Sequence, residues 1–122
     1  MLVPQVDADG NDRGGVPMLE LAAPLGTFTG WNILEPALRD LGYLSGLTGS
    51  FVPFARTQSE RRAVHDDRLS IEERYRGRSE YASRVDRAAA ALVRDRFMLP
   101  EDVAAATARA SQRWSVLVES GP

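Results

Sequence analysis

The sequence predicts a small α+β fold, in which a short N-terminal β-hairpin and an irregular apolar segment are followed by a C-terminal helical hairpin of three helices. Three observations support this prediction. Turn-forming dipeptides interrupt the first twenty residues, eight of the ten glycines precede residue 56, and apolar residues recur at steps of three and four after residue 70. We therefore divide the chain into a β-hairpin and Gly/Pro-rich loop segment at 1–55 and a helical segment at 56–122, expected to form one structural unit.

The first element is expected to be a β-hairpin. A short apolar run ends at Val6, Asp-Gly and Gly-Gly dipeptides follow, and a second strand is predicted from about Val16 to Leu21. The acidic turn resembles the start of a calcium loop, but an EF-hand needs Gly at the position of Asp12 and Glu at that of Met18. We interpret the turn as solvated, and expect neither a metal nor a cofactor.

The next segment, from Ala22 to Ala55, is apolar but aperiodic. Only a short helix from Pro36 to Leu41 is predicted within it, with Gly42 as its stop. Loops normally run over the surface and are polar, so an apolar irregular segment of this length suits packing against something larger.

The helical segment begins with a capping box, in which Ser70 and Glu73 start a short helix that runs to about Arg76. A second helix is predicted from Ser79 to about Met98 and a third from Pro100 to about Val118, because proline suits a first helical turn. Each long helix carries an apolar stripe at steps of three and four. The stripes comprise Tyr81, Val85, Ala88, Ala89, Leu92 and Val93 in the second helix, and Val103, Thr107, Ala110, Trp114 and Leu117 in the third.

Composition excludes several classes of function. A net charge of −2 argues against nucleic-acid binding, and the absence of cysteine excludes disulfides and thiolate chemistry. All fifteen basic residues are Arg and none is Lys. We interpret this as the coding bias of a GC-rich bacterial genome. The sequence has neither a signal-peptide pattern nor an apolar run of membrane-spanning length, so we expect no membrane partner and favour a cytoplasmic location for the chain as given.

The catalytic motifs are incomplete. The run Gly46-Leu47-Thr48-Gly49-Ser50 has the outline of a G-x-S-x-G nucleophile elbow, but Thr48 replaces the serine and Ser50 the closing glycine. The only histidine, His65, lies in a polar loop where a solvated role is the simpler interpretation. No catalytic residue is assigned, and whether the chain is an enzyme stays open.

Four stretches carry a resemblance to a known family: LVPQVDADGNDRGGVPMLELAAPLGTFTGWN, GLTGSFVPFARTQSER, SIEERY and ALVRDRFMLPEDVAAATARA. Together they resemble the C-terminal portion of a family of bacterial alpha/beta-hydrolase-domain proteins of poorly defined substrate. The resemblance implies esterase-like or lipase-like ancestry, with the serine elbow and the main sheet lying upstream of the matched part.

Two functions are compatible with this resemblance. The first is the C-terminal accessory portion of a serine-hydrolase-like protein, partnered by the remainder of a hydrolase-like chain. The second is a non-catalytic interaction or oligomerisation module that forms a homo-oligomer through Val103, Ala110, Trp114 and Leu117.

Polar side chains beside aromatic residues are candidates for one wall of a substrate pocket, because such mixtures line small-molecule sites. The alternative is that Phe28, Trp31, Phe51 and Phe54 are core residues. The pocket candidates are Thr29, Trp31, Asn32, Thr48 and Ser50.

Overall fold

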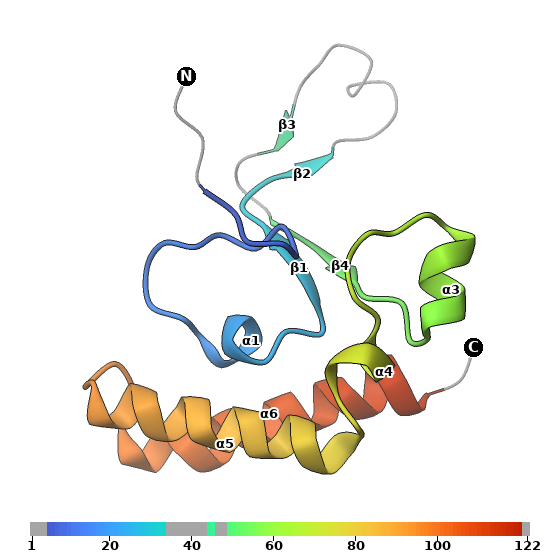
Figure 1. The fold of residues 1–122 in the computed structure, drawn as a ribbon. Helices are drawn as coiled ribbons and strands as arrows, with labels where there is room; N and C mark the ends of the chain where they lie inside the picture. Colours follow the sequence, from blue (N-terminus) through green and yellow to red (C-terminus); the bar gives the residue numbers. More distant parts are fainter. Residues whose placement is uncertain (1–4, 34–43, 46–48, 121–122) are drawn as a thin grey trace.

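The computed structural model describes residues 5–33, 44–45 and 49–120. Within these ranges the chain is a mixed α+β domain, as predicted, in which antiparallel strand pairs and short helices lie on one side of a long helical hairpin (Figure 1). The elements in chain order are α1 (Leu19–Ala22), β1 (Gly26–Thr29), β2 (Asn32–Ile33), β3 (Leu44–Ser45), β4 (Ser50–Pro53), α3 (Gln58–Ala63), α4 (Ile71–Arg74), α5 (Arg78–Arg94), the 3₁₀ turn η1 (Pro100–Asp102), α6 (Val103–Trp114) and the π-helical turn η2 (Ser115–Glu119).

The N-terminal turn forms, but the strand predicted after it does not. Val6 and Asp12 make a single antiparallel bridge around a turn in which Gly10 has a φ of 78°. The stretch from Val16 to Leu21 was expected to be a strand, and helix α1 begins inside it at Leu19. Burial explains the difference, because α1 turns Leu19 into the core shared with α5 and α6. Tertiary packing thus overrides the local alternation of the sequence.

The described residues of the apolar middle segment include two pairs of antiparallel strands. Strands β1 and β4 pair with Gly26 opposite Pro53 and Thr29 opposite Ser50, and β2 pairs with β3 through Asn32 and Ser45. Gly26 is required by close approach, because a Cβ there would lie 2.6 Å from both the Phe51 ring and the Val52 carbonyl oxygen. The helix predicted from Pro36 to Leu41 lies outside the described residues.

The helical hairpin is confirmed. Helix α4 begins after the Ser70 and Glu73 capping box, α5 follows it, and Pro100 opens the turn into α6. A further helix, α3, begins with a second capping box formed by Thr57 and Glu60, which the prediction did not include.

The core joins the two halves of the chain. Aromatic rings fill its centre, where Tyr81 and Trp114 lie 4.9 Å apart between ring centroids and Tyr75 meets both edge-on. Helix α1 and the residues that flank β1 and β4, Leu25 and Phe54, therefore share one core with the hairpin. The buried apolar residues are Leu19, Ala23, Leu25, Phe54, Ile71, Tyr75, Tyr81, Val85, Ala89, Leu92, Ala106, Ala110 and Trp114.

Candidate functional site

Two of the pocket candidates meet at the end of the β1 and β4 pair. The Thr29 Oγ1 and Ser50 Oγ atoms lie 2.5 Å apart, and the Ser50 backbone amide donates to Thr29 Oγ1 at 3.2 Å. The Thr29 hydroxyl also donates to the Trp31 carbonyl oxygen at 2.5 Å. A hydroxyl has one proton, so Ser50 is the donor within the pair. This arrangement fastens two strand ends and leaves Ser50 hydrogen-bonded to a neutral hydroxyl.

The remaining pocket candidates are Trp31, Asn32 and Thr48. Trp31 lies between β1 and β2 with 46% of its surface exposed, so it is not a core residue. Asn32 stands in β2 opposite Ser45, and Thr48 lies outside the described residues. Phe28 and Phe51 face each other across the strands with ring centroids 4.7 Å apart, and only Phe54 of the four aromatic residues is fully buried. The role of this cluster as a pocket wall stays a prediction.

His65 makes no hydrogen bond to these hydroxyl groups. It lies on the exposed loop after α3 in a left-handed conformation with a φ of 54°, and its backbone amide donates to the Arg62 carbonyl oxygen. In the described part of the chain its imidazole makes no hydrogen bond or ion pair. A serine nucleophile needs a histidine base oriented by a carboxylate, and the described residues contain no such relay.

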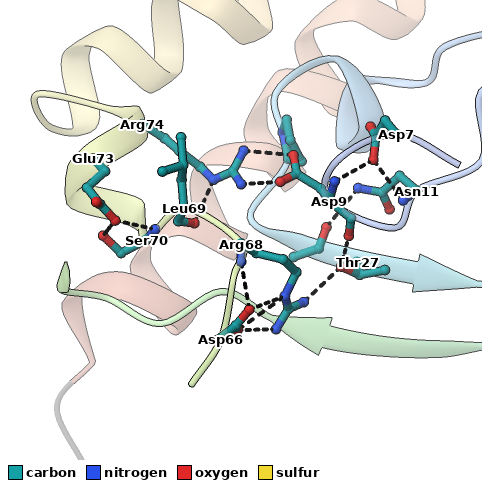
Figure 2. A network of polar contacts seen from close by, with 12 residues as sticks. Asp7, Asp9, Asn11, Thr27, Asp66, Arg68, Leu69, Ser70, Glu73 and Arg74 are labelled. Carbon is teal, nitrogen blue, oxygen red and sulfur yellow. Dashed lines mark hydrogen bonds and ion pairs between the residues drawn. The ribbon is translucent and has the colours of Figure 1, made fainter. Parts of the chain in front are cut away.

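A polar network ties the strands to α4, and two arginines organise it (Figure 2). The Arg68 guanidinium binds both carboxylate oxygens of Asp66, with the shortest distance 2.6 Å. It also donates to Thr27 Oγ1 at 2.8 Å and to the Val52 carbonyl oxygen at 3.1 Å. One side chain thereby connects the loop before α4 with both β1 and β4. The Arg68 side chain holds the pKa of Asp66 below its usual value.

Arg74 makes the second link, between α4 and the N-terminal turn. Its guanidinium forms a two-point ion pair with Asp9, donates to the Leu69 carbonyl oxygen at 2.8 Å and lies 4.0 Å from the centroid of the Phe54 ring. The Asp9 side chain is only 15% exposed. The sequence suggested a solvated acidic turn. One of its carboxylates is instead largely buried against an arginine.

Asn11 closes the outer edge of β1. Its side-chain nitrogen donates to the Gly26 carbonyl oxygen at 3.3 Å, and its side-chain oxygen accepts from the Phe28 backbone amide at 2.8 Å. The side chain thus makes the pair of bonds that a neighbouring strand would make, and it is 1% exposed. Arg68 also donates to the Pro53 carbonyl oxygen of β4 at 3.4 Å, so side chains bond backbone groups of both strands of this ribbon.

Glu73 joins α3 to α4. Its carboxylate accepts from Arg61 Nε at 2.7 Å, from the backbone amide and hydroxyl of Ser70, and from the Gln58 side chain. The Arg61 guanidinium, followed by the Ser70 donors, holds the pKa of Glu73 well below its usual range. This site stabilises structure, because Ser70 is fully buried and every bond is internal.

The predicted interface stripe on the third helix lies mainly inside the molecule. Ala110 and Trp114 are buried, whereas Val103 and Leu117 are partly buried beside the core. The Tyr81 hydroxyl donates to the Ala110 carbonyl oxygen at 3.3 Å, and Trp114 Nε1 donates to Glu119. Burial also raises the pKa of Tyr75 to about 12. A partner at this stripe would meet only its edges, so its role as an interface stays a prediction.

Sequence reasoning missed the residues of the polar network. The partners Asp9 and Arg74, or Thr27 and Arg68, are far apart in the chain and carry no local motif. In residues 5–33, 44–45 and 49–120, no group of three His, Asp or Glu side chains is placed to hold a metal ion. No helix in the same ranges is long and apolar enough to cross a membrane.

Comparison with known families identifies the lineage. The model of the family described as alpha/beta hydrolase domain matches residues 2–108, which is most of the chain. This protein therefore belongs to the alpha/beta hydrolase domain family. Comparisons with curated protein sequences and with solved structures gave no match.

Proposed function

We propose that this chain is the C-terminal accessory portion of an esterase-like or lipase-like serine hydrolase, and that it supplies structure and pocket wall rather than the nucleophile. The observation that carries the proposal is that, in the described part of the chain, no histidine is hydrogen-bonded to Ser50. Ser50 is hydrogen-bonded to Thr29, and the imidazole of the only histidine, His65, has no partner in the described part of the chain. Family membership supplies the hydrolase context.

The partner in this proposal is the remainder of a hydrolase-like chain. Asn11 already bonds backbone groups on the outer edge of β1, so the partner's sheet does not continue through this edge. Contact through side chains fits better, and Trp31 offers a large exposed aromatic surface beside the Thr29 and Ser50 hydroxyls. Apolar surface with a few polar groups is the usual composition of a pocket wall.

A reconstitution tests the proposal. The coding sequence upstream of Met1 is read for a G-x-S-x-G motif, and the protein that carries it is co-expressed with this chain. We expect the two to co-purify and ester hydrolysis to require both. Full hydrolysis by the upstream protein alone, or the absence of any such upstream sequence, would count against an accessory role.

The pocket wall has its own test in the assembled enzyme. Trp31→Ala and Ser50→Ala are expected to change turnover or KM without changing the fold, because Trp31 is exposed and Ser50 lies at a strand end. Phe97→Ala, at a side chain that is 63% exposed on the loop after α5, is the control. Unchanged kinetics in both wall variants would remove these residues from the site.

A further inference from the structure

An open hollow between helix α6 and strand β4 combines apolar and basic side chains. Its volume is about 420 Å³, which is within the range of small-molecule sites. Phe51 of β4 forms one wall, and α6 and η2 supply the rest. Positions 109, 112, 113 and 116 follow steps of three and four, so one side of the helix presents them together. The lining comprises Phe51, Arg109, Gln112, Arg113, Val116 and Leu117.

The polar side chains at this hollow differ in what they already bind. In the described part of the chain, neither the Arg109 guanidinium nor the Gln112 amide makes a hydrogen bond or an ion pair. Arg113 pairs with Glu20 at 3.2 Å, and its guanidinium carbon lies 5.9 Å from the centroid of the Phe28 ring. Glu20 thus balances the charge of Arg113, whereas the charge of Arg109 is left over.

The neighbouring charges do not cancel this excess. Arg109 also lines a second hollow, to which Arg96 and Asp102 contribute one charge of each sign. Asp102 is seven positions before Arg109, about 10 Å along the helix axis, and forms no ion pair with it. No carboxylate is among the described residues that line the first hollow. Its surroundings therefore carry one net positive charge.

The apolar groups lie toward the C-terminal end of the same side. Val116 is 60% exposed and is seven positions after Arg109, which again corresponds to about 10 Å. Phe51 is held against Phe28, with ring centroids 4.7 Å apart, so this wall of the hollow is fixed by packing. A ligand that matches the hollow has a charged end at Arg109 and an apolar body that reaches Val116.

We propose that this hollow binds a monocarboxylic acid with an aliphatic chain. The guanidinium fork of Arg109 matches the two oxygens of a carboxylate, and one uncompensated charge matches a monoanion. The Gln112 amide, less than one turn away, can donate to the same group. The chain would lie on Phe51, Val116 and Leu117. The inference does not rest on the proposed hydrolase role.

An NMR titration of the isotope-labelled chain with sodium octanoate, below its micelle concentration, tests the charged end. Saturable amide shifts are expected at residues 109–117, with much weaker binding of 1-octanol and of acetate. Arg109→Gln should weaken octanoate binding by about tenfold, because it removes the charge-assisted bonds. Arg87→Gln, at an exposed position of α5, is the matched control and should bind normally.

The apolar end is tested separately. Val116→Ser should weaken octanoate binding severalfold, whereas Val64→Ser, at a side chain that is 71% exposed after α3, should not. The amide spectrum of each variant shows whether it keeps the fold. The proposal would be overturned if octanoate caused no saturable shifts at this hollow, if 1-octanol bound as tightly, or if Arg109→Gln kept its affinity in a native-like spectrum.

Discussion

At the scale of single residues, the Asn11 side chain connects the N-terminal turn to strand β1. It occupies the outer edge of β1 with two hydrogen bonds to backbone groups that are otherwise shielded from water. A buried amide or carbonyl group left without a partner costs free energy, whereas the same group exposed to water does not. The side chain therefore both orders the N-terminal turn and protects the strand edge.

We predict that Asn11→Ala lowers the free energy of unfolding by about 1–3 kcal/mol, because it leaves the Phe28 amide and the Gly26 carbonyl unpaired. Chemical denaturation measures the change. Asp12→Ala, at an exposed neighbouring position, should have a much smaller effect. Equal effects of the two substitutions would contradict the role given to Asn11.

The Glu73 carboxylate makes a pH-dependent contribution. Its pKa in the folded state lies below the ordinary value of 4.5, because Arg61 and the Ser70 donors favour the charged form. Its stabilising effect is therefore fully present above about pH 4.5 and is lost as the pH falls below that value. Glu73→Gln should unfold with a flatter dependence on pH between 5 and about 2. If the pH profiles of the variant and the wild-type chain were parallel, Glu73 would not be the titrating group.

At the scale of elements, the long helices were predictable and the strands were not. Helices α5 and α6 combine an apolar period with proline or glycine boundaries, and α4 has a capping box, so local sequence suffices. The β1 and β4 pair depends on contacts across more than twenty residues, which no local pattern reveals. Helix α3 had a signal in Thr57-Gln58-Ser59-Glu60, but its lack of buried residues gave no apolar period to support it.

Helix α3 offers a test of local stability. Thr57 Oγ1 accepts from the Glu60 amide at 3.1 Å, and Glu60 accepts from the amides of Arg56 and Thr57. Thr57→Ala should weaken this helix by about 0.5–2 kcal/mol. Because α3 buries nothing, we expect faster hydrogen exchange at residues 58–63 with little change in global unfolding. Ser59→Ala is the matched control, and a global loss of stability in Thr57→Ala would refute the local assignment.

The candidate site could be predicted only in part. Thr29 and Ser50 were named from their residue types, and the strand register brings them together. The Asp9, Arg68 and Arg74 links could not be found, because the charge of a side chain does not reveal its distant partner. The prediction of a strand from Val16 to Leu21 was wrong because it also depended on a distant contact. Burial of Leu19 against the helical hairpin favours helix α1 in this stretch.

At the scale of the whole molecule, the aromatic centre holds both halves together. Trp114 is 4% exposed and touches Tyr75 and Tyr81, while Trp31 is largely exposed on the ribbon. Trp114→Ala should cost about 3–5 kcal/mol, and exchange at the Phe28 amide should rise together with that of the helices. Trp31→Ala, the same change at the other tryptophan, should cost far less. A ribbon that kept its protection in Trp114→Ala would indicate two independent units.

We propose that this member of the alpha/beta hydrolase domain family supplies structure without its own catalytic serine. The most direct measurement is labelling of the purified chain with a fluorophosphonate probe, which reacts with activated serines. We expect no labelling, because Ser50 is bonded to Thr29 and the described residues bring no histidine base to it. Labelling at a single serine, lost in Ser50→Ala or His65→Ala, would instead show that the chain is a complete hydrolase.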